Sequence, residues 1–352
     1  MLPAERSRLL SLDAMRGLAA VAVILFHLDF IAPFAQSGYL AVDFFFLMSG
    51  VVIARSYQTR LEHGLPLSGF VIERLIRLYP LYLLGLSIGL LRRVGQIATD
   101  HAIQMSWPDL GISTIFNLLM LPSPVTDELA PINGPSWSLY LELFVNVVWA
   151  GFLVKASRRT LIAYVCLLGL ALCGAIAAAG WAQAGYTWTG IYFGLLRSFF
   201  GFGLGVLLAK SWRPGRPRDS ALALVSWFAL CAVLVIDVAP RYRPLYDIVA
   251  IFVCFPAIVC MGVAFNPPRA LQRVATALGD MSYPVYMLHL GPLFSFSYFA
   301  RKMGVGAEIW VPIFIIGICW VSLYLARTYD PAARRYMKDM LARRGKKLAP
   351  SP

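Results

Sequence analysis

Two basic residues occur in the first long apolar run of the chain. Arg16 and His27 are 11 positions apart, and over this distance a helix turns about 1100°, which is about 20° past three full turns. The two side chains therefore share one helix face and lie about 16 Å apart along its axis. A histidine titrates near neutral pH and suits general-base chemistry. The alternative is a structural histidine bonded to a neighbouring helix, with an arginine that reaches toward the membrane surface.

A pair of arginines stands at the start of another apolar run. Arg74 and Arg77 are three positions apart and share a helix face. Two adjacent guanidinium groups can bind phosphates through paired hydrogen bonds. Glu73 stands beside them, and we expect it to neutralise part of their charge. The alternative is that both arginines anchor the helix end at lipid head groups.

Two carboxylates lie inside other apolar runs, where a charge is costly unless it has a partner. Asp43 comes directly before three phenylalanines, so we expect it to face protein or water and to orient a histidine or an arginine of a neighbouring helix. Ser138 and Glu142 are four positions apart and share a helix face. The alternative is an ordinary interhelical hydrogen bond for Asp43, and a helix cap followed by a structural carboxylate for Ser138 and Glu142.

A polar stripe occurs in a later apolar run. Ser282, Tyr286 and His289 recur at helical spacing, so they are expected on one face of a helix. The stripe supports a functional pocket or, alternatively, holds neighbouring helices together through hydrogen bonds.

The elements that must position these residues are membrane helices. Hydrophobic residues make up 59% of the 352 residues and charged residues 14%, and the mean hydropathy is +0.69. A soluble domain is about 45–50% apolar and about 25% charged. The composition therefore predicts an all-α, polytopic transmembrane bundle. We expect one membrane domain at 1–326 and a basic cytoplasmic tail at 327–352 that lies on anionic lipid head groups.

Ten apolar segments are long enough to cross a membrane as helices of about 20 residues. A shorter segment at 109–121 is bounded by prolines and is expected to form a re-entrant or interfacial helix, within an outer loop at 94–135. Of the 31 Lys and Arg residues, 23 fall on one side of this arrangement, 6 on the other and 2 within spans. This asymmetry predicts that both termini are cytoplasmic. The ten predicted spans are 14–33, 38–54, 75–92, 136–154, 161–180, 190–209, 221–239, 245–264, 281–299 and 309–326.

Other classes of site and partner are disfavoured. The net charge of +13 would suit nucleic-acid binding in a soluble chain, but here the basic residues follow the cytoplasmic loops. The six cysteines all fall inside predicted spans without a Cys-x-x-Cys pair, so we expect them to be buried apolar residues rather than disulfides. We expect no metal site and no permanently bound cofactor.

Taken in order, these motifs resemble the acyltransferase-3 family of multi-pass membrane acyltransferases. The resemblance runs from about residue 9 to residue 326, and some family members carry a periplasmic esterase-like domain after the bundle, which we do not expect here. The motifs that carry the resemblance are Leu12-Asp13-Ala-Met-Arg16-Gly17 through His27, Val42-Asp43-Phe-Phe-Phe, Arg74-Leu-Ile-Arg77-Leu-Tyr79-Pro80, Trp137-Ser138-Leu-Tyr-Leu-Glu142 and Ser282-Tyr-Pro-Val-Tyr286-Met-Leu-His289.

The resemblance implies an integral membrane O-acyltransferase. Family members move an acyl group, usually acetyl from acetyl-CoA, to a hydroxyl of a carbohydrate or lipid-linked sugar at the outer membrane face. A bacterial inner membrane is the expected location, and membrane lipids are expected partners. The site residues that it implies are His27, Arg16 and Glu142 for catalysis, Arg74 and Arg77 for acyl-CoA, and Asp43, Ser138, Arg197, Tyr286 and His289 for the supporting pocket.

These expectations combine into one chemical hypothesis. The CoA phosphates bind the paired arginines, and His27 either takes the proton of the acceptor hydroxyl or forms a transient acyl-imidazole. Glu142 or Asp43 would hold the imidazole, and an arginine or Tyr286 would donate to the developing oxyanion. The competing hypothesis is a transporter or a flippase for lipid-linked sugars. It predicts internal symmetry of the kind that many transporters show, and the sequence shows no such repeat.

Overall fold

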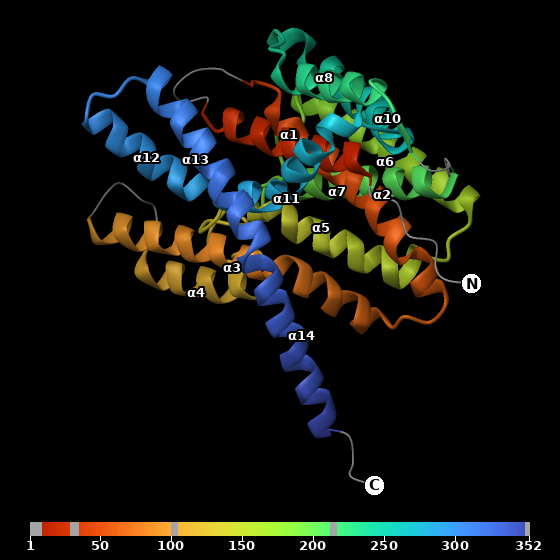
Figure 1. Cartoon of the computed structure of the whole chain (residues 1–352), viewed down its shortest axis with the longest axis horizontal. Coiled ribbons are helices and arrows are strands. Elements are labelled where there is room, and N and C mark those ends of the chain that lie inside the picture. The colour runs from red at the N-terminus through yellow and green to blue at the C-terminus, as the bar shows by residue number, and fades with distance from the viewer. Residues whose placement is uncertain (1–8, 29–34, 100–104, 212–216, 349–352) are drawn as a thin grey trace.

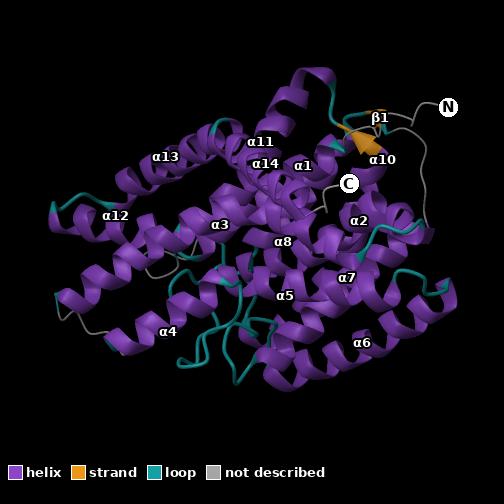
Figure 2. Cartoon of the chain, turned by 90° about the horizontal axis from the view of Figure 1, so that it is seen from below, coloured by secondary structure: helices purple, strands orange, loops and turns teal. Residues whose placement is uncertain are grey.

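The computed structural model describes residues 9–28, 35–99, 105–211 and 217–348. These residues form a bundle of α-helices (Figure 1, Figure 2). Two short strands, Arg218–Asp219 (β1) and Phe265–Asn266 (β2), pair in parallel. The all-α fold class is therefore confirmed.

The described residues contain fourteen α-helices. Short 3-10 turns lie at Gly38–Leu40, Pro240–Tyr242 and Arg269–Leu271, and π-helical segments at Trp149–Leu153 and Ala250–Cys254. The α-helices are α1 (Leu10–Phe26), α2 (Ala41–Glu62), α3 (Leu67–Ala98), α4 (Trp107–Leu118), α5 (Ser136–Val148), α6 (Arg158–Ala179), α7 (Ile191–Ser211), α8 (Leu222–Val235), α9 (Arg243–Val249), α10 (Phe255–Ala264), α11 (Gln272–Leu288), α12 (Leu290–Lys302), α13 (Ala307–Arg327) and α14 (Tyr329–Leu348).

Seven helices of the described chain are long and apolar enough to cross a membrane. They correspond to seven of the ten predicted spans, and the chain is a multi-pass membrane protein. The predicted segments at 14–33, 221–239 and 281–299 fall on shorter helices, and residues 29–33 lie outside the described part. The number of spans and the side of the membrane at which each terminus lies stay predictions. The seven are Gly38–Glu62, Leu67–Ala98, Ser136–Leu153, Arg158–Ala179, Ile191–Ser211, Pro240–Ala264 and Ala307–Arg343.

The predicted span at 281–299 is wrong as a single helix. Helix α11 begins already at Gln272 and ends at Leu288, and α12 begins at Leu290. The sequence pattern missed the early start because the first turns of α11 are polar. His289 lies at the junction, where its side chain bonds to backbone carbonyls of α11.

The short helix predicted at 109–121 is confirmed as α4, although its bounds differ. Ser106 caps its first turn and exchanges hydrogen bonds with Asp109 in a capping box. The hydroxyl of Tyr79 on α3 donates to the Leu118 carbonyl at 2.6 Å. This bond ties α4 to α3, and the two helices lie side by side in both views (Figure 1, Figure 2). That α4 is re-entrant or interfacial in the membrane stays a prediction.

Glycines allow the central helices to approach closely. A Cβ at Gly50 of α2 would collide with the backbone carbonyl of Phe202 on α7, and one at Gly205 with that of Leu47. The glycine-rich run of α7 therefore serves helix packing at Gly205. In the same way Gly17 lets α1 lie directly against α11.

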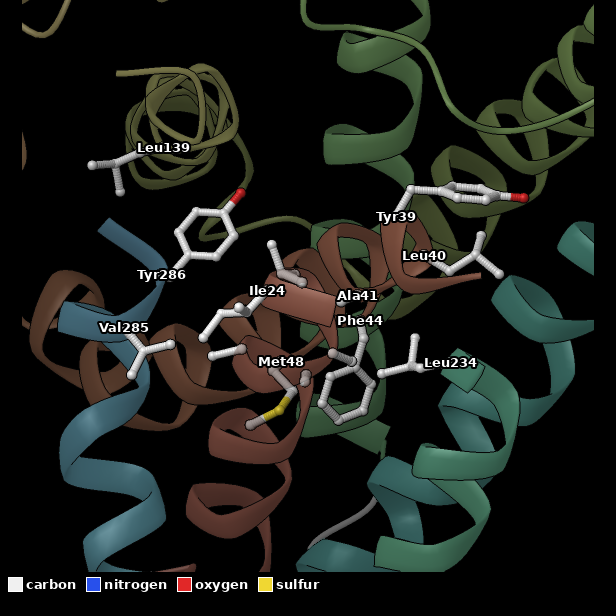
Figure 3. Close-up of a cluster of buried hydrophobic side chains, with 14 of the residues drawn as sticks. Ile24, Tyr39, Leu40, Ala41, Phe44, Met48, Leu139, Leu234, Val285 and Tyr286 are labelled. Atoms are coloured by element: carbon white, nitrogen blue, oxygen red, sulfur yellow. The ribbon is translucent and has the colours of Figure 1, made fainter. Parts of the chain in front are cut away.

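The apolar core lies where α1, α2, α8 and α11 meet. Ile24 of α1, Phe44 and Met48 of α2, Leu234 of α8 and Val285 of α11 are all buried there, and Figure 3 shows their side chains converging from these helices. This core fixes α1 against α11, which is the contact that positions the site residues described below.

Residues 329–348 of the predicted basic tail form a helix. Helix α14 follows α13 almost without interruption and projects away from the bundle (Figure 1). Tyr329 at its start donates to the Pro80 carbonyl of α3 at 3.3 Å. The expectation of buried cysteines is wrong: Cys166 is exposed and the other five are partly exposed, all of them free thiols.

Candidate active site

Two cavities lie inside the bundle, and all of the predicted site residues except Asp43 and His289 line one or both of them. We call the smaller one, of about 180 Å³, the arginine cavity, and the larger one, of about 480 Å³, the histidine cavity. Val42 and Tyr286 line both of them, so the cavities lie back to back on either side of these two side chains. The polar lining of the arginine cavity includes Arg16, Arg74, Arg77, Ser138, Glu142 and Ser282. That of the histidine cavity includes His27, Arg92, Arg93, Glu128, Trp137 and Arg197.

His27 follows the last residue of α1 and contacts a second histidine. Its Nδ1 lies 2.8 Å from the Val23 carbonyl oxygen and 3.3 Å from Nε2 of His289. His289 is fully buried, and its own Nδ1 lies 3.0 Å from the carbonyl oxygens of Val285 and of Tyr286. The stripe that sequence spacing predicted on α11 therefore reaches the imidazole of α1.

These contacts assign the protons of the two rings. Carbonyl oxygens only accept hydrogen bonds, so Nδ1 of His289 carries a proton and its Nε2, in the neutral ring, is an acceptor. Nδ1 of His27 then donates to Val23 and faces the His289 acceptor. In the neutral imidazole of His27 the remaining nitrogen, Nε2, bears no proton, and it has no hydrogen-bond partner among the described residues. It is the basic nitrogen of a residue that lines the histidine cavity.

Arg16 lies on the same face of α1 as His27, as the spacing predicted. Its Nε donates to the Ser282 hydroxyl at 2.8 Å and its Nη2 to the Gly279 carbonyl at 3.1 Å. Asp13 lies 3.5 Å from the same nitrogen. Both basic residues thus bind α11, but Arg16 lines the arginine cavity and His27 the histidine cavity.

Arg74 and Arg77 line the arginine cavity together, each with its own acid. Nη2 of Arg74 lies 3.1 Å from Oε1 of Glu142, which also accepts from the Ser49 hydroxyl at 2.7 Å. Nη1 of Arg77 lies 3.5 Å from Oδ2 of Asp330 at the start of α14. Nε of Arg74 is buried without a hydrogen-bond partner, so this guanidinium keeps a donor for a ligand.

The expectation that Glu73 neutralises part of the charge of Arg74 and Arg77 is wrong. Glu73 binds Arg60 through both carboxylate oxygens, at 2.8 and 2.5 Å. Adjacency in sequence placed Glu73 near Arg74, but neighbouring helix positions point about 100° apart. Glu73 therefore does not neutralise the arginine cavity.

Asp43 orients an arginine rather than a histidine. Its two oxygens accept from Nε and Nη2 of Arg197 at 2.9 and 2.6 Å, and both side chains are only 2% exposed. Arg197 also donates to the Ala184 carbonyl at 2.8 Å and lies 5.8 Å from the ring centre of Trp137. This ion pair joins α2 to α7 in the wall of the histidine cavity.

The expectation that Asp43 or Glu142 holds the imidazole is wrong. Both carboxylates are occupied by arginines, and neither bonds to His27 in the described structure. His289 takes that place, a residue that sequence spacing placed in the supporting pocket without a defined role.

Tyr286 joins the two cavities to α5. Its hydroxyl lies 2.7 Å from Oγ of Ser138, and the Phe45 ring packs edge-on against it with centres 5.4 Å apart. Tyr286 projects from α11 toward α5 (Figure 3). The predicted pocket residues Ser138 and Tyr286 therefore meet, at the wall between the cavities.

Sequence reasoning missed three charged residues of the histidine cavity. Arg92 and Arg93 stand at the end of an apolar run, where the sequence shows only two positive charges, and Glu128 lies in the loop before α5. The available signal was that arginines are scarce on the predicted outer side. Among the described residues, no cluster of three His, Cys, Asp or Glu side chains could hold a metal ion.

Comparison with known proteins identifies the family. The family described as "Acyltransferase domain" matches residues 9–327. No solved structure is significantly similar to the chain. "Protein 2 in picA locus" of Rhizobium radiobacter is 33% identical over 171 residues, which are 43% of this chain and 86% of that protein.

Two longer matches carry functional names. Peptidoglycan O-acetyltransferase OatA of Listeria monocytogenes is 26% identical over 79% of this chain and 48% of its own length. The putative membrane-bound transacylase BcsY of Komagataeibacter xylinus is 26% identical over 82% of this chain and 73% of its own length. The chain thus spans about half of OatA and most of BcsY. It belongs to the acyltransferase-3 family, and residues 9–327 form its acyltransferase domain.

Proposed function

We propose that this protein transfers an acyl group, acetyl in the simplest case, from acyl-CoA to a hydroxyl of a carbohydrate or lipid-linked sugar. The observation that carries the proposal is the contact of His27 Nδ1 with the Val23 carbonyl, which leaves Nε2 as the basic nitrogen of the neutral ring, in a cavity that shares Val42 and Tyr286 with a cavity of three arginines. A base is thereby placed next to a site for a polyanion. The proposed location is a bacterial inner membrane.

The arginine cavity suits the phosphates of CoA. Arg16, Arg74 and Arg77 line it together, and their guanidinium groups present donors in the geometry that phosphate oxygens accept. In the proposed orientation this cavity faces the cytoplasm, where acyl-CoA is found. The phosphates would then stay near the membrane surface, and the acyl end of the pantetheine arm would pass Val42 and Tyr286 toward His27.

The histidine cavity suits the acceptor. Its volume of about 480 Å³ falls within the range of about 300–1,000 Å³ that is typical of small-molecule sites. The curated relatives include a peptidoglycan O-acetyltransferase, which supports a hydroxyl of an envelope carbohydrate as the acceptor.

The proposed reaction uses His27 as a general base. Nε2 takes the proton of the acceptor hydroxyl while the hydroxyl oxygen bonds to the thioester carbonyl carbon. The carbon–sulfur bond then breaks, and the imidazolium gives the proton to the departing CoA sulfur. The Tyr286 hydroxyl, at the wall between the cavities, donates to the oxyanion that forms in between. The products are an O-acyl sugar and free CoA.

Acetyl transfer by the purified protein in nanodiscs tests this proposal. We expect His27→Gln to lower the rate of CoA release by about 10²–10⁴-fold, the usual contribution of a general base. Arg74→Gln should raise the KM for acetyl-CoA about tenfold, as expected for the loss of a charge-assisted hydrogen bond.

The matched control is Arg60→Gln. Arg60 is an arginine of α2 that pairs with Glu73 and lines neither cavity, so its loss should leave both kinetic constants unchanged. The assay uses radiolabelled acetyl-CoA with glucose, N-acetylglucosamine oligosaccharides and peptidoglycan fragments as acceptors. Undiminished turnover by His27→Gln, or failure of the native protein to bind acetyl-CoA, would refute the proposed function.

A further inference from the structure

Six arginines line the two cavities, and one of them differs from the others in its charge environment. Arg92 lines the histidine cavity and forms no ion pair with a carboxylate of the described residues. The other five each lie within 4.0 Å of an acid: Arg16 with Asp13, Arg74 with Glu142, Arg77 with Asp330, Arg93 with Glu128 and Arg197 with Asp43.

The side chains that contact Arg92 directly are neutral, and the charges of Arg93 and Glu128 act on it without an ion pair or a hydrogen bond. Its guanidinium lies 5.1 Å from the ring centre of Phe294 on α12, and Nη1 donates to the Gln96 side-chain oxygen at 3.3 Å. Its Nε is buried without a hydrogen-bond partner. A charged group that is half-buried in an apolar setting with an unsatisfied donor is costly, and it points to a missing partner.

The free edge of Arg92 has the shape of an anion site. Nε and Nη2 form one side of a guanidinium, and neither has a partner among the described residues. In Arg197 the same edge binds both oxygens of Asp43, at 2.9 and 2.6 Å. A carboxylate or phosphate of a ligand can bind Arg92 in the same two-point manner.

The neighbouring Arg93 does not compete for this role. Its Nε donates to the Pro131 carbonyl at 2.9 Å, and its Nη2 lies 3.8 Å from Oε2 of Glu128. Arg93 therefore holds the loop before α5 against α3. Arg92, on the same turn of α3, is left with an unpaired charge in the histidine cavity.

We propose that the acceptor is an anionic carbohydrate and that Arg92 binds its carboxylate or phosphate group while a hydroxyl of the same molecule faces His27. The inference rests on the proposed function, because it assigns the acceptor to the histidine cavity. A neutral sugar would enter the same cavity and leave the charge of Arg92 uncompensated. Arg92 thus sets the class of acceptor, whereas His27 acts on its hydroxyl.

Binding of three sugars to the purified protein in nanodiscs tests the inference by calorimetry. The probes are glucuronate, glucose 1-phosphate and neutral glucose. The native protein should bind at least one of the two anions about tenfold more tightly than glucose, since a charge-assisted hydrogen bond contributes more than a neutral one. Arg92→Gln should remove this preference, and Arg92→Lys should retain part of it, because lysine keeps the charge but lacks the two-point edge.

Arg241→Gln is the matched control. Arg241 also lies over an aromatic ring, that of Tyr242 at 4.5 Å, but it lines neither cavity, so its loss should leave the preference intact. A preference for glucuronate alone supports a carboxylate-bearing acceptor, and a preference for glucose 1-phosphate alone supports a sugar phosphate. Equal binding of all three sugars, no binding of any, or equal losses in Arg92→Gln and Arg241→Gln would overturn the inference.

Measuring acetyl-CoA binding and turnover beside sugar binding distinguishes a failure of this inference from a failure of the proposed function. If the native protein releases CoA but binds charged and neutral sugars equally, only the role of Arg92 fails. If the anionic sugars bind through Arg92 but acetyl-CoA is neither bound nor turned over, the proposed function fails and the anion site stands. Weaker acetyl-CoA binding in Arg92→Gln, with sugar binding unchanged, would reassign the anion to the donor and overturn the inference.

Discussion

Replacing His289 by leucine should slow acyl transfer modestly while leaving acetyl-CoA binding unchanged. The change removes the acceptor at 3.3 Å from Nδ1 of His27, but the shorter bond to the Val23 carbonyl at 2.8 Å remains. The imidazole therefore keeps its tautomer and loses one of two orienting contacts. A neutral hydrogen bond contributes about 0.5–1.5 kcal/mol, which corresponds to about a 2- to 13-fold decrease in rate.

The measurement is CoA release in a single turnover with saturating acetyl-CoA. A double-mutant cycle supplies the control: in a His27→Gln background, His289→Leu should cause no further loss, because it acts through the absent imidazole. A decrease of more than about 100-fold in the single variant, with the protein folded, would refute this reasoning. It would mean that His289 itself takes part in proton transfer, on the scale of a general base.

Two further predictions concern the fold around the site. Asp43→Asn leaves the buried guanidinium of Arg197 without its anion, so the free energy of unfolding in mixed micelles should fall by about 3–5 kcal/mol; an unchanged unfolding curve would contradict the role of this pair. Gly50→Ala places a methyl group against the Phe202 carbonyl and should lower the free energy of unfolding by about 1–3 kcal/mol. Gly95→Ala is the same change with nothing within 4 Å, and it should have no effect or stabilise α3 by up to about 1 kcal/mol.

Helical periodicity predicted the faces of the site helices correctly. Arg16 and His27 both contact α11, as their spacing required, and Ser138 reaches Tyr286. Hydropathy located the apolar helices because a helix that crosses the lipid consists mostly of apolar residues. It could not detect the junction at His289, where both flanking segments are apolar and the chain changes helix within one residue.

Ion pairing between helices could not be read from the sequence. Spacing shows which face a carboxylate occupies but not which neighbouring helix lies opposite, so the partners of Asp43 and Glu142 stayed open. The pairs with Arg197 and Arg74 join residues 154 and 68 positions apart. Arg92 was missed for a related reason, because its significance lies in its lack of an ion pair with any described carboxylate, which only the packed structure shows.

The wall between the two cavities bears on whether protons can leak across the membrane. Val42 and Tyr286 stand between two cavities that, in the proposed orientation, open to opposite sides of the membrane. The hydrogen bond between Tyr286 and Ser138 and the packing of Phe45 hold this wall in place. A permanent water-filled channel here would let protons leak and would dissipate the proton-motive force. In the proposed function, this wall would let an acyl group cross the membrane without opening such a channel.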